Sequence, residues 1–300
     1  MNSKLFLSNL PAIIVVVIFF VIIGLLYFFN LRKKRRKSPL TRELLRSPGE
    51  SLRIESENLT LDIVFYFMML FLFPIMIFST YLSQVYFGAV RENSVIIGMY
   101  AFVALVSIGL CSYKLWKLLK ERNNYQLGLD CEIAVGQELN QLMLEGCKVF
   151  HDFPVEEFNK KFNIDHIVVS PKGVFAVETK GRAKPTNEET VVYDGKVLKF
   201  PGWTESEPLE QARRNAKWLS KWLSSAVDAK IQVNSVIAIP GWYIKREITD
   251  DMFVFNGKNP ENLLKRNDYL SPELMKSISH QLEQKCRDVE PTAYNQGRKK

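Results

Sequence analysis

Two carboxylates and a lysine are spaced so that one β-hairpin can bring them together. Asp165 lies in one β-rich run, Glu178 and Lys180 lie at the end of the next, and the turn Ser170-Pro171-Lys172-Gly173 separates them. Successive side chains of a strand point to opposite faces, so Glu178 and Lys180 share a face. A two-residue loop places Asp165 directly opposite Glu178. A type I turn with a glycine bulge shifts the register by one residue and makes the pair diagonal.

This combination of side chains suits the hydrolysis of phosphodiester bonds. Oxygen ligands from Asp165 and Glu178 can hold Mg²⁺, which usually takes one or two carboxylates and keeps several waters. Such a metal neutralises the phosphate and lowers the pKa of a bound water, and Lys180 then positions that water or stabilises the developing charge. The alternative is a structural hairpin in which the three residues form a solvated polar face.

A third carboxylate comes from a helix expected over Gln126–Gly146. On that helix Glu132 falls near the centre of an apolar stripe, whereas Glu138 lies well off it. A carboxylate that faces the core is costly unless it is paired, protonated or bound to metal. Either Glu132 pairs with a buried arginine or lysine, or it reaches the site beside Asp165 and Glu178, which is the favoured interpretation.

The surrounding elements indicate an α/β chain with a mixed (α+β) sheet flanked by helices. Alternation and turn signals predict that His166 points away from Asp165, as a core histidine satisfied by hydrogen bonds. Apolar periodicity predicts a helix over Ser206–Ala226, with Gln211 one face away from its apolar stripe. The expected strands are Cys147–Val155, Ile164–Val169, Val174–Thr179, a hairpin around Asp194-Gly195, Gln232–Ile239 and Met252–Phe255, and a last helix runs from about Ser271 to Cys286.

These residues together resemble the nuclease-related domain (NERD) family of the PD-(D/E)xK restriction-endonuclease-like superfamily. The resemblance covers about residues 125–240 and rests on four segments: Gly128-Leu-Asp-Cys-Glu132, Ile164-Asp-His-Ile-Val-Val-Ser-Pro-Lys-Gly-Val-Phe175, Val177-Glu-Thr-Lys180 and Pro208-Leu-Glu-Gln211. The family usually has glycine where this chain has Cys131.

The resemblance implies a restriction-endonuclease-like core and a site that uses Mg²⁺, or Mn²⁺ in its place. It implies metal-site roles for Glu132, Asp165 and Glu178. It also implies that Lys180 is the catalytic lysine and that Gln211 is a supporting polar residue.

The N-terminal part of the chain indicates an all-α membrane region of three transmembrane helices. The apolar run from Pro11 to Phe29 is long enough to cross a bilayer core of about 30 Å. Two further spans are expected at about residues 61–82 and 94–113. Positive charges cluster after the first and third spans, which by the positive-inside rule puts the N-terminus outside and everything after Tyr113 in the cytoplasm.

The basic run Arg32–Lys37 can be read in two ways. It can serve as a topology signal that also touches anionic headgroups of the inner membrane, which is the favoured interpretation, or as a nucleic-acid patch. These features divide the chain into a membrane region (1–120), a nuclease-like domain (121–245) and a C-terminal helical extension with a polar tail (246–300).

Net charge and amino-acid composition limit the classes of partner and of metal site to be expected. A formal net charge of +8 suits an anionic partner, either nucleic acid or lipid. The four cysteines form no CxxC pair, which argues against a zinc site or a disulfide framework. Arg213, Arg214 and Lys217 lie beside tryptophans on the second helix and are candidates for phosphate contact, the alternative being an ordinary amphipathic helix.

Two functions follow as hypotheses. The first is a membrane-anchored, metal-dependent nuclease that cleaves DNA, or RNA as the less favoured substrate, on the cytoplasmic side. The second is a catalytically silent module that binds nucleic acid or a protein and is tethered to the membrane.

Overall fold

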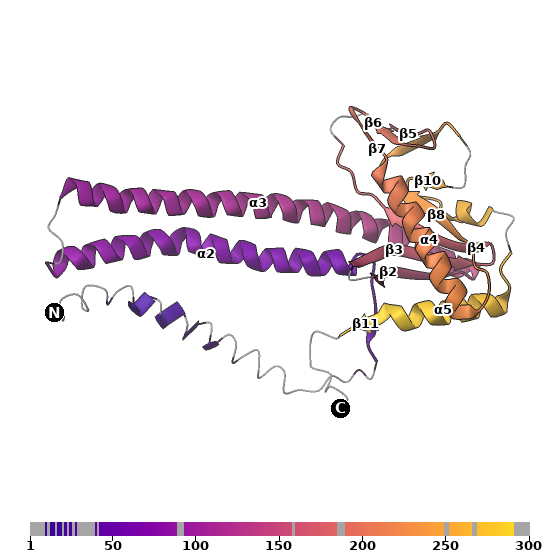
Figure 1. Cartoon of the computed structure of the whole chain (residues 1–300), viewed down its shortest axis with the longest axis horizontal. Coiled ribbons are helices and arrows are strands. Elements are labelled where there is room, and N and C mark those ends of the chain that lie inside the picture. Colours follow the sequence, from indigo (N-terminus) through magenta and orange to yellow (C-terminus); the bar gives the residue numbers. More distant parts are fainter. Residues whose placement is uncertain are drawn as a thin grey trace. The chain divides into compact units, whose positions relative to one another are not determined.

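The structure is a computed structural model whose described residues form two compact units (Figure 1). One unit contains residues 56–123, and the other combines residues 42–55 with residues 124–290. Parts of the predicted span at residues 11–29, and all of the basic run at 32–37, lie outside the described residues. The described residues are 42–88, 93–157, 160–184, 190–248, 252–265 and 269–290, with residue 40 and scattered positions between 10 and 28.

Two long helices, α2 (Glu50–Tyr86) and α3 (Ser94–Gln141), supply the unit at residues 56–123. They lie side by side there, because Tyr100 Oη donates to Gln84 Oε1 at 2.7 Å and Arg122 Nε donates to Thr60 Oγ1 at 3.0 Å. Both helices are long and apolar enough to cross a membrane, and only 6% of the apolar window of each is buried. That exposure distinguishes them from the core helices of a soluble protein, whose apolar faces are covered.

The structure corrects the predicted break between the third span and the following helix. A span at 94–113 and a separate helix at 126–146 were expected, but α3 runs without interruption from Ser94 to Gln141. Residues 114–125 contain neither proline nor glycine and are rich in Lys, Leu, Glu and Arg, which favour helix. A 3₁₀ turn, η1 (Leu142–Glu145), then ends at Gly146 in the left-handed conformation.

The other unit is built on a mixed five-stranded sheet. Its strand order is β10-β8-β4-β3-β2, in which β2, β3 and β4 pair antiparallel and β4, β8 and β10 pair parallel. The mixed α/β architecture and the order of these elements agree with the prediction. The strands are β2 (Lys148–Glu157), β3 (Lys160–Ser170), β4 (Gly173–Thr179), β8 (Val233–Ala238) and β10 (Phe253–Phe255).

Helices cover both faces of this sheet. The end of α3, through Val135 and Leu139, and the following η1, through Leu142, pack against one face. On the other face, α4 (Glu207–Val227) and α5 (Pro272–Cys286) cover a core that includes Val174 and Ala176. The apolar stripe predicted on α4 is buried as expected: Leu209, Ala212, Ala216, Leu219 and Leu223.

A smaller four-stranded sheet packs against the first half of α4. Its order is β7-β6-β5-β9, and Tyr193, Leu198 and Trp242 form part of its core. The predicted hairpin at Asp194-Gly195 joins β5 to β6. The bounds are β5 (Thr190–Tyr193), β6 (Leu198–Phe200), β7 (Trp203–Glu205) and β9 (Tyr243–Arg246), and the remaining elements are η2 (Pro260–Lys265) and the pair β1 (Leu44–Leu45) and β11 (Arg287–Val289).

Candidate active site

The β3–β4 hairpin decides the register of the two strand carboxylates. Ser170 pairs with Gly173 and His166 pairs with Val177, so the loop has two residues. The same register continued by one residue puts Asp165 directly opposite Glu178, which was the first of the two predicted arrangements. The backbone N–H of Thr179 donates to Asp165 Oδ2 at 2.7 Å and fixes that carboxylate at the end of the strands.

Lys180 is held between a carboxylate and an amide. Its Nζ lies 2.8 Å from Glu178 Oε1 and donates to Gln211 Oε1 at 2.9 Å. Burial alone lowers the pKa of this amine, but Glu178 and Asp165 outweigh that effect and raise it. Lys180 therefore stays protonated at neutral pH and acts as a cationic donor rather than as a base.

Asn215 completes this group and was missed in the sequence. Its Nδ2 donates to Glu178 Oε2 at 2.9 Å, and its side chain is buried. Gln211 and Asn215 are one helical turn apart on α4, so the helix presents both amides to the site. The available signal was a polar residue four positions after Gln211 on the edge of an apolar stripe.

Glu132 lies beside this group, buried to 8% exposure. Burial, then repulsion from Asp152 and Glu178, raises its pKa to about 8, while Lys180 and a backbone hydrogen bond from Gly49 act in the opposite direction. In the described part of the chain no lysine or arginine forms an ion pair with Glu132. The structure thus brings Glu132 near Glu178 without the buried cation that was its alternative partner.

Burial and neighbouring negative charges disfavour the charged form of each of the three carboxylates. Burial and repulsion from Glu178 and Glu132 hold the pKa of Asp165 well above its usual range. Burial likewise raises the pKa of Glu178, against the opposing effect of Lys180. A cluster of this kind favours a bound proton or cation.

The site offers Mg²⁺ a small set of oxygen donors. Across the described residues, no group of three or more His, Cys, Asp or Glu side chains is arranged to hold a metal ion. The opposed carboxylates of Asp165 and Glu178 nevertheless supply the one or two ligands that Mg²⁺ usually takes from protein. The fit therefore rests on this pair, with Glu132 as a neighbour.

On the other face of β3, His166 belongs to a buried chain of hydrogen bonds, as predicted for a core histidine. Its Nδ1 lies 2.9 Å from His151 Nδ1, and its Nε2 lies 3.2 Å from Thr179 Oγ1. His151 Nε2 lies 3.0 Å from Asn140 Oδ1. Burial lowers the pKa of His151 to about 4 and that of His166 well below its usual value, so both rings are neutral. These hydrogen bonds support Thr179, whose backbone N–H holds Asp165.

The basic residues of α4 lie apart from this group. Arg213, Arg214 and Lys217 are exposed on the outer face of the helix. Arg214 pairs with Glu207, and Arg213 donates to the carbonyl of Gly195. Neighbouring Trp218 and Trp222 are partly buried, stacked on each other and packed against Phe153, which favours the amphipathic interpretation of the tryptophans.

Comparison with known proteins gives one match. No curated protein and no solved structure matches the chain significantly. Residues 127–240, which carry Glu132, Asp165, Glu178, Lys180 and both amides of α4, match the family model described as the nuclease-related domain, NERD.

Proposed function

We propose that the chain is a membrane-anchored, metal-dependent nuclease that hydrolyses phosphodiester bonds of DNA, with RNA as the less favoured substrate. The observation that carries this proposal is the convergence of Asp165, Glu178 and Lys180 at the end of two paired strands, within the range that matches NERD. Glu132 and the two amides of α4 support the same group.

The residues divide the chemical work. Bound at Asp165 and Glu178, Mg²⁺ or Mn²⁺ supplies charge neutralisation of the phosphate and a more acidic water. An ammonium group has three donors, and Lys180 uses two of them on Glu178 and Gln211. Its third N–H can hold the attacking water or the phosphate oxygen on which charge develops. Asn215 and Thr179 keep Glu178 and Asp165 in place while this happens.

The membrane assignment rests on α2 and α3 and on which segments of the chain make up the unit that contains the strands. Residues 42–55 and 124–290 form one compact unit, so a chain that crosses the membrane in α2 must return in α3 to the same side. Basic residues after α3's apolar part support the proposal that this side is the cytoplasmic side of an inner membrane. Anionic headgroups are the proposed partners of Arg32–Lys37.

Nucleic acid is the proposed substrate partner of the exposed cations on α4. Arg213 and Lys217 offer sequence-independent contacts to phosphate, and Arg214 can join them by leaving Glu207. Such contacts make binding weaken steeply with salt.

A catalytically silent binding module is the second candidate. Both oxygens of Glu178 already accept hydrogen bonds, from Lys180 and Asn215, and the described residues contain no ready group of three metal-binding side chains. In that case the same fold binds nucleic acid or protein without cutting it.

Cleavage by the full chain, purified in detergent, separates the two candidates. Plasmid, single-stranded DNA and RNA are incubated with Mg²⁺ or Mn²⁺, beside Asp165→Asn and Lys180→Met. The proposal expects cleavage by the parent and a loss of at least about 100-fold in each variant. Glu156→Gln, which alters an exposed residue of β2, is the matched control and keeps full activity. A folded parent that binds nucleic acid but cuts none of the substrates supports the binding module.

A further inference from the structure

The segment that leads into α2 and forms its first turns is packed against α3 beside the candidate site. Residues 42–55, here called the arm, belong to the same compact unit as the strands. A Cβ on Gly136 would lie 2.6 Å from Pro48 Cγ, and one on Gly128 would lie 3.2 Å from Leu52 Cδ1. Two glycines about two helical turns apart thus make room for the arm.

Gly49 is the point of the arm that meets Glu132. It adopts a left-handed backbone conformation with φ of 69°, and the position of a Cβ there lies 3.6 Å from Glu132 Oε2 and 2.5 Å from Leu129 Cδ1. The backbone of Gly49 also forms the hydrogen bond with the Glu132 carboxylate that opposes the rise of its pKa. Only glycine combines this conformation with this close approach.

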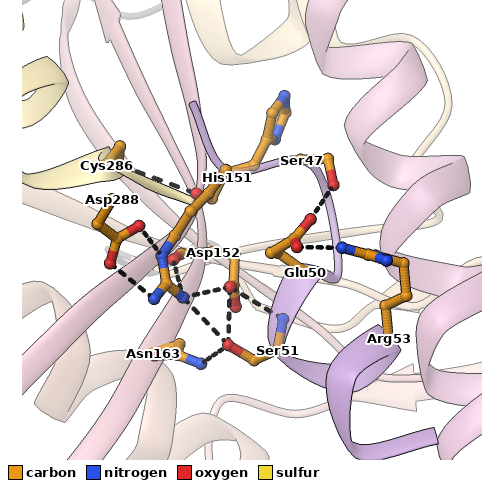
Figure 2. Close-up of polar contacts among 10 residues, drawn as sticks. Ser47, Glu50, Ser51, Arg53, His151, Asp152, Asn163, Cys286 and Asp288 are labelled. Carbon is orange, nitrogen blue, oxygen red and sulfur yellow. Dashed lines mark hydrogen bonds and ion pairs between the residues drawn. The ribbon is translucent and has the colours of Figure 1, made fainter. Parts of the chain in front are cut away.

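A buried ion pair anchors the arm to β2. Arg46 Nη1 donates to Asp152 Oδ2 at 2.6 Å, and Asp152 is 3% exposed. The same Oδ2 accepts hydrogen bonds from the backbone N–H and the hydroxyl of Ser51, at 3.0 and 2.7 Å (Figure 2). Asn163 Nδ2 donates to the Ser51 hydroxyl at 2.6 Å. Asp152 is therefore the common acceptor for both ends of the short segment that contains Gly49.

The C-terminal end of the unit also contacts Arg46 and the arm. Arg46 also forms two hydrogen bonds with Asp288, from Nε at 2.7 Å and Nη2 at 2.8 Å. β1 of the arm pairs antiparallel with β11, and the backbone N–H of Arg46 donates to the carbonyl of Cys286. A half-buried guanidinium that binds two carboxylates in this way holds a fixed geometry.

We propose that the arm is a positioning element of the candidate active site: it holds Glu132 beside Asp165 and Glu178, so that its anchor at Asp152 sets the affinity of the site for a divalent cation. This inference rests on the proposed function for the identity of the site. It extends the site beyond residues 127–240, to a segment that the family match does not include. Since the end of the arm forms the start of α2, the site is joined through the backbone to a candidate membrane helix.

The inference is tested by measuring Mn²⁺ binding to the full chain in detergent, without nucleic acid, by isothermal titration calorimetry. Ser51→Ala removes the hydroxyl that links Asp152, Arg46 and Asn163 but leaves both charges in place. Asp152→Asn removes the acceptor charge. Each is expected to weaken Mn²⁺ binding by about tenfold or more, as is usual when a residue that orients a metal ligand is lost. Glu156→Gln, which breaks an exposed ion pair on the same strand, is the control and leaves binding unchanged.

A double-mutant cycle separates positioning from general loosening of the fold. If the arm acts through Glu132, Ser51→Ala has no further effect on Mn²⁺ affinity in a Glu132→Gln background. An equal loss in both backgrounds, or unchanged affinity in the folded single variants, overturns the inference. Should Asp152→Asn fail to fold, as judged by circular dichroism, Ser51→Ala alone carries the test.

The calorimetry also distinguishes this inference from the proposed function. A parent that binds Mn²⁺ and responds to the arm variants but cuts no nucleic acid refutes the nuclease and leaves the positioning role intact. A parent that cuts nucleic acid with unchanged Mn²⁺ affinity in the arm variants refutes only the positioning role. A parent that binds no Mn²⁺ refutes the inference itself.

Discussion

Single residues of this site are placed where they cost stability. Burial raises the pKa of Glu132, Asp165 and Glu178, and repulsion from Glu178 adds to the rise for Glu132 and Asp165. Of these three carboxylates, only Glu178 forms an ion pair, with Lys180. Clustered, buried carboxylates with raised pKa values are typical of functional sites.

Replacing Glu132 by glutamine is therefore expected to stabilise the protein at alkaline pH. The unfolded chain loses the Glu132 proton near the ordinary glutamate pKa of 4.5, whereas the folded protein keeps it until about pH 8. Stability due to this proton is complete below pH 4.5 and falls as the pH rises towards 8. At pH 9 the variant should be more stable than the parent by about 1–3 kcal/mol.

Thermal unfolding between pH 5 and pH 9 measures this difference. The gap between the melting temperatures of Glu132→Gln and the parent should widen with pH, and Mg²⁺ should narrow it by stabilising the parent. A gap that is constant across this range contradicts the raised pKa.

At the scale of elements, α3 performs two tasks along one uninterrupted helix. Its apolar part, near Ser94–Tyr113, meets the length and composition of a membrane span, and its last turns cover one face of the five-stranded sheet. The glycines of α3 differ accordingly. Gly98 and Gly109 have open space around them, whereas Gly128 and Gly136 meet the arm.

Gly136→Ala is expected to destabilise the unit formed by residues 42–55 and 124–290. Alanine normally stabilises a helix relative to glycine by up to about 1 kcal/mol. Here its Cβ would lie 2.6 and 2.8 Å from two ring atoms of Pro48, which cannot rotate away, so a net loss of about 1–3 kcal/mol follows.

Chemical unfolding monitored by tryptophan fluorescence provides the measurement. Gly109→Ala is the control, because nothing lies within 4 Å of the added methyl group, and it should leave the unit's stability unchanged. An equal change in the free energy of unfolding in Gly136→Ala and Gly109→Ala contradicts the close approach of Pro48 to Gly136.

For the whole molecule, the crossing of a membrane is restricted because residues 42–55 and residues 124–290 belong to one compact unit. The arm and residues 124–290 fold together, while α2 and α3 connect them. The arm and the strands must therefore share one side of any membrane that these helices cross. By the positive-inside rule, the distribution of Lys and Arg predicts that this side is the cytoplasm.

Labelling of single introduced cysteines with a membrane-impermeant maleimide tests this topology. In intact cells Tyr86→Cys should react, whereas Glu43→Cys and Lys196→Cys should react only in inside-out vesicles. The parent, in which Cys111, Cys147 and Cys286 are buried and Cys131 is half-buried, gives the background. Labelling of residues 43 and 196 from opposite sides contradicts the two-helix hairpin, and reaction of both in intact cells reverses its orientation.

The sequence alone determined the order of elements and the core of the site, because those features depend on neighbours in the chain. Strand alternation put Glu178 and Lys180 on one face and left Asp165 either directly opposite Glu178 or diagonal to it, and the structure has the first of these arrangements. The apolar stripe of α4 and the interior position of His166 followed from local periodicity in the same way.

Only the tertiary structure decided which distant segments complete that core. Nothing in the local pattern joins Gly49 to Glu132, Arg46 to Asp152 and Asp288, or His151 to His166. Likewise, β10 and α5 come from the part predicted as a C-terminal extension, yet β10 extends the sheet and α5 packs on its α4 face. Such contacts are selected by packing and by the pairing of buried charges between residues far apart in the chain, and periodicity carries no information about them.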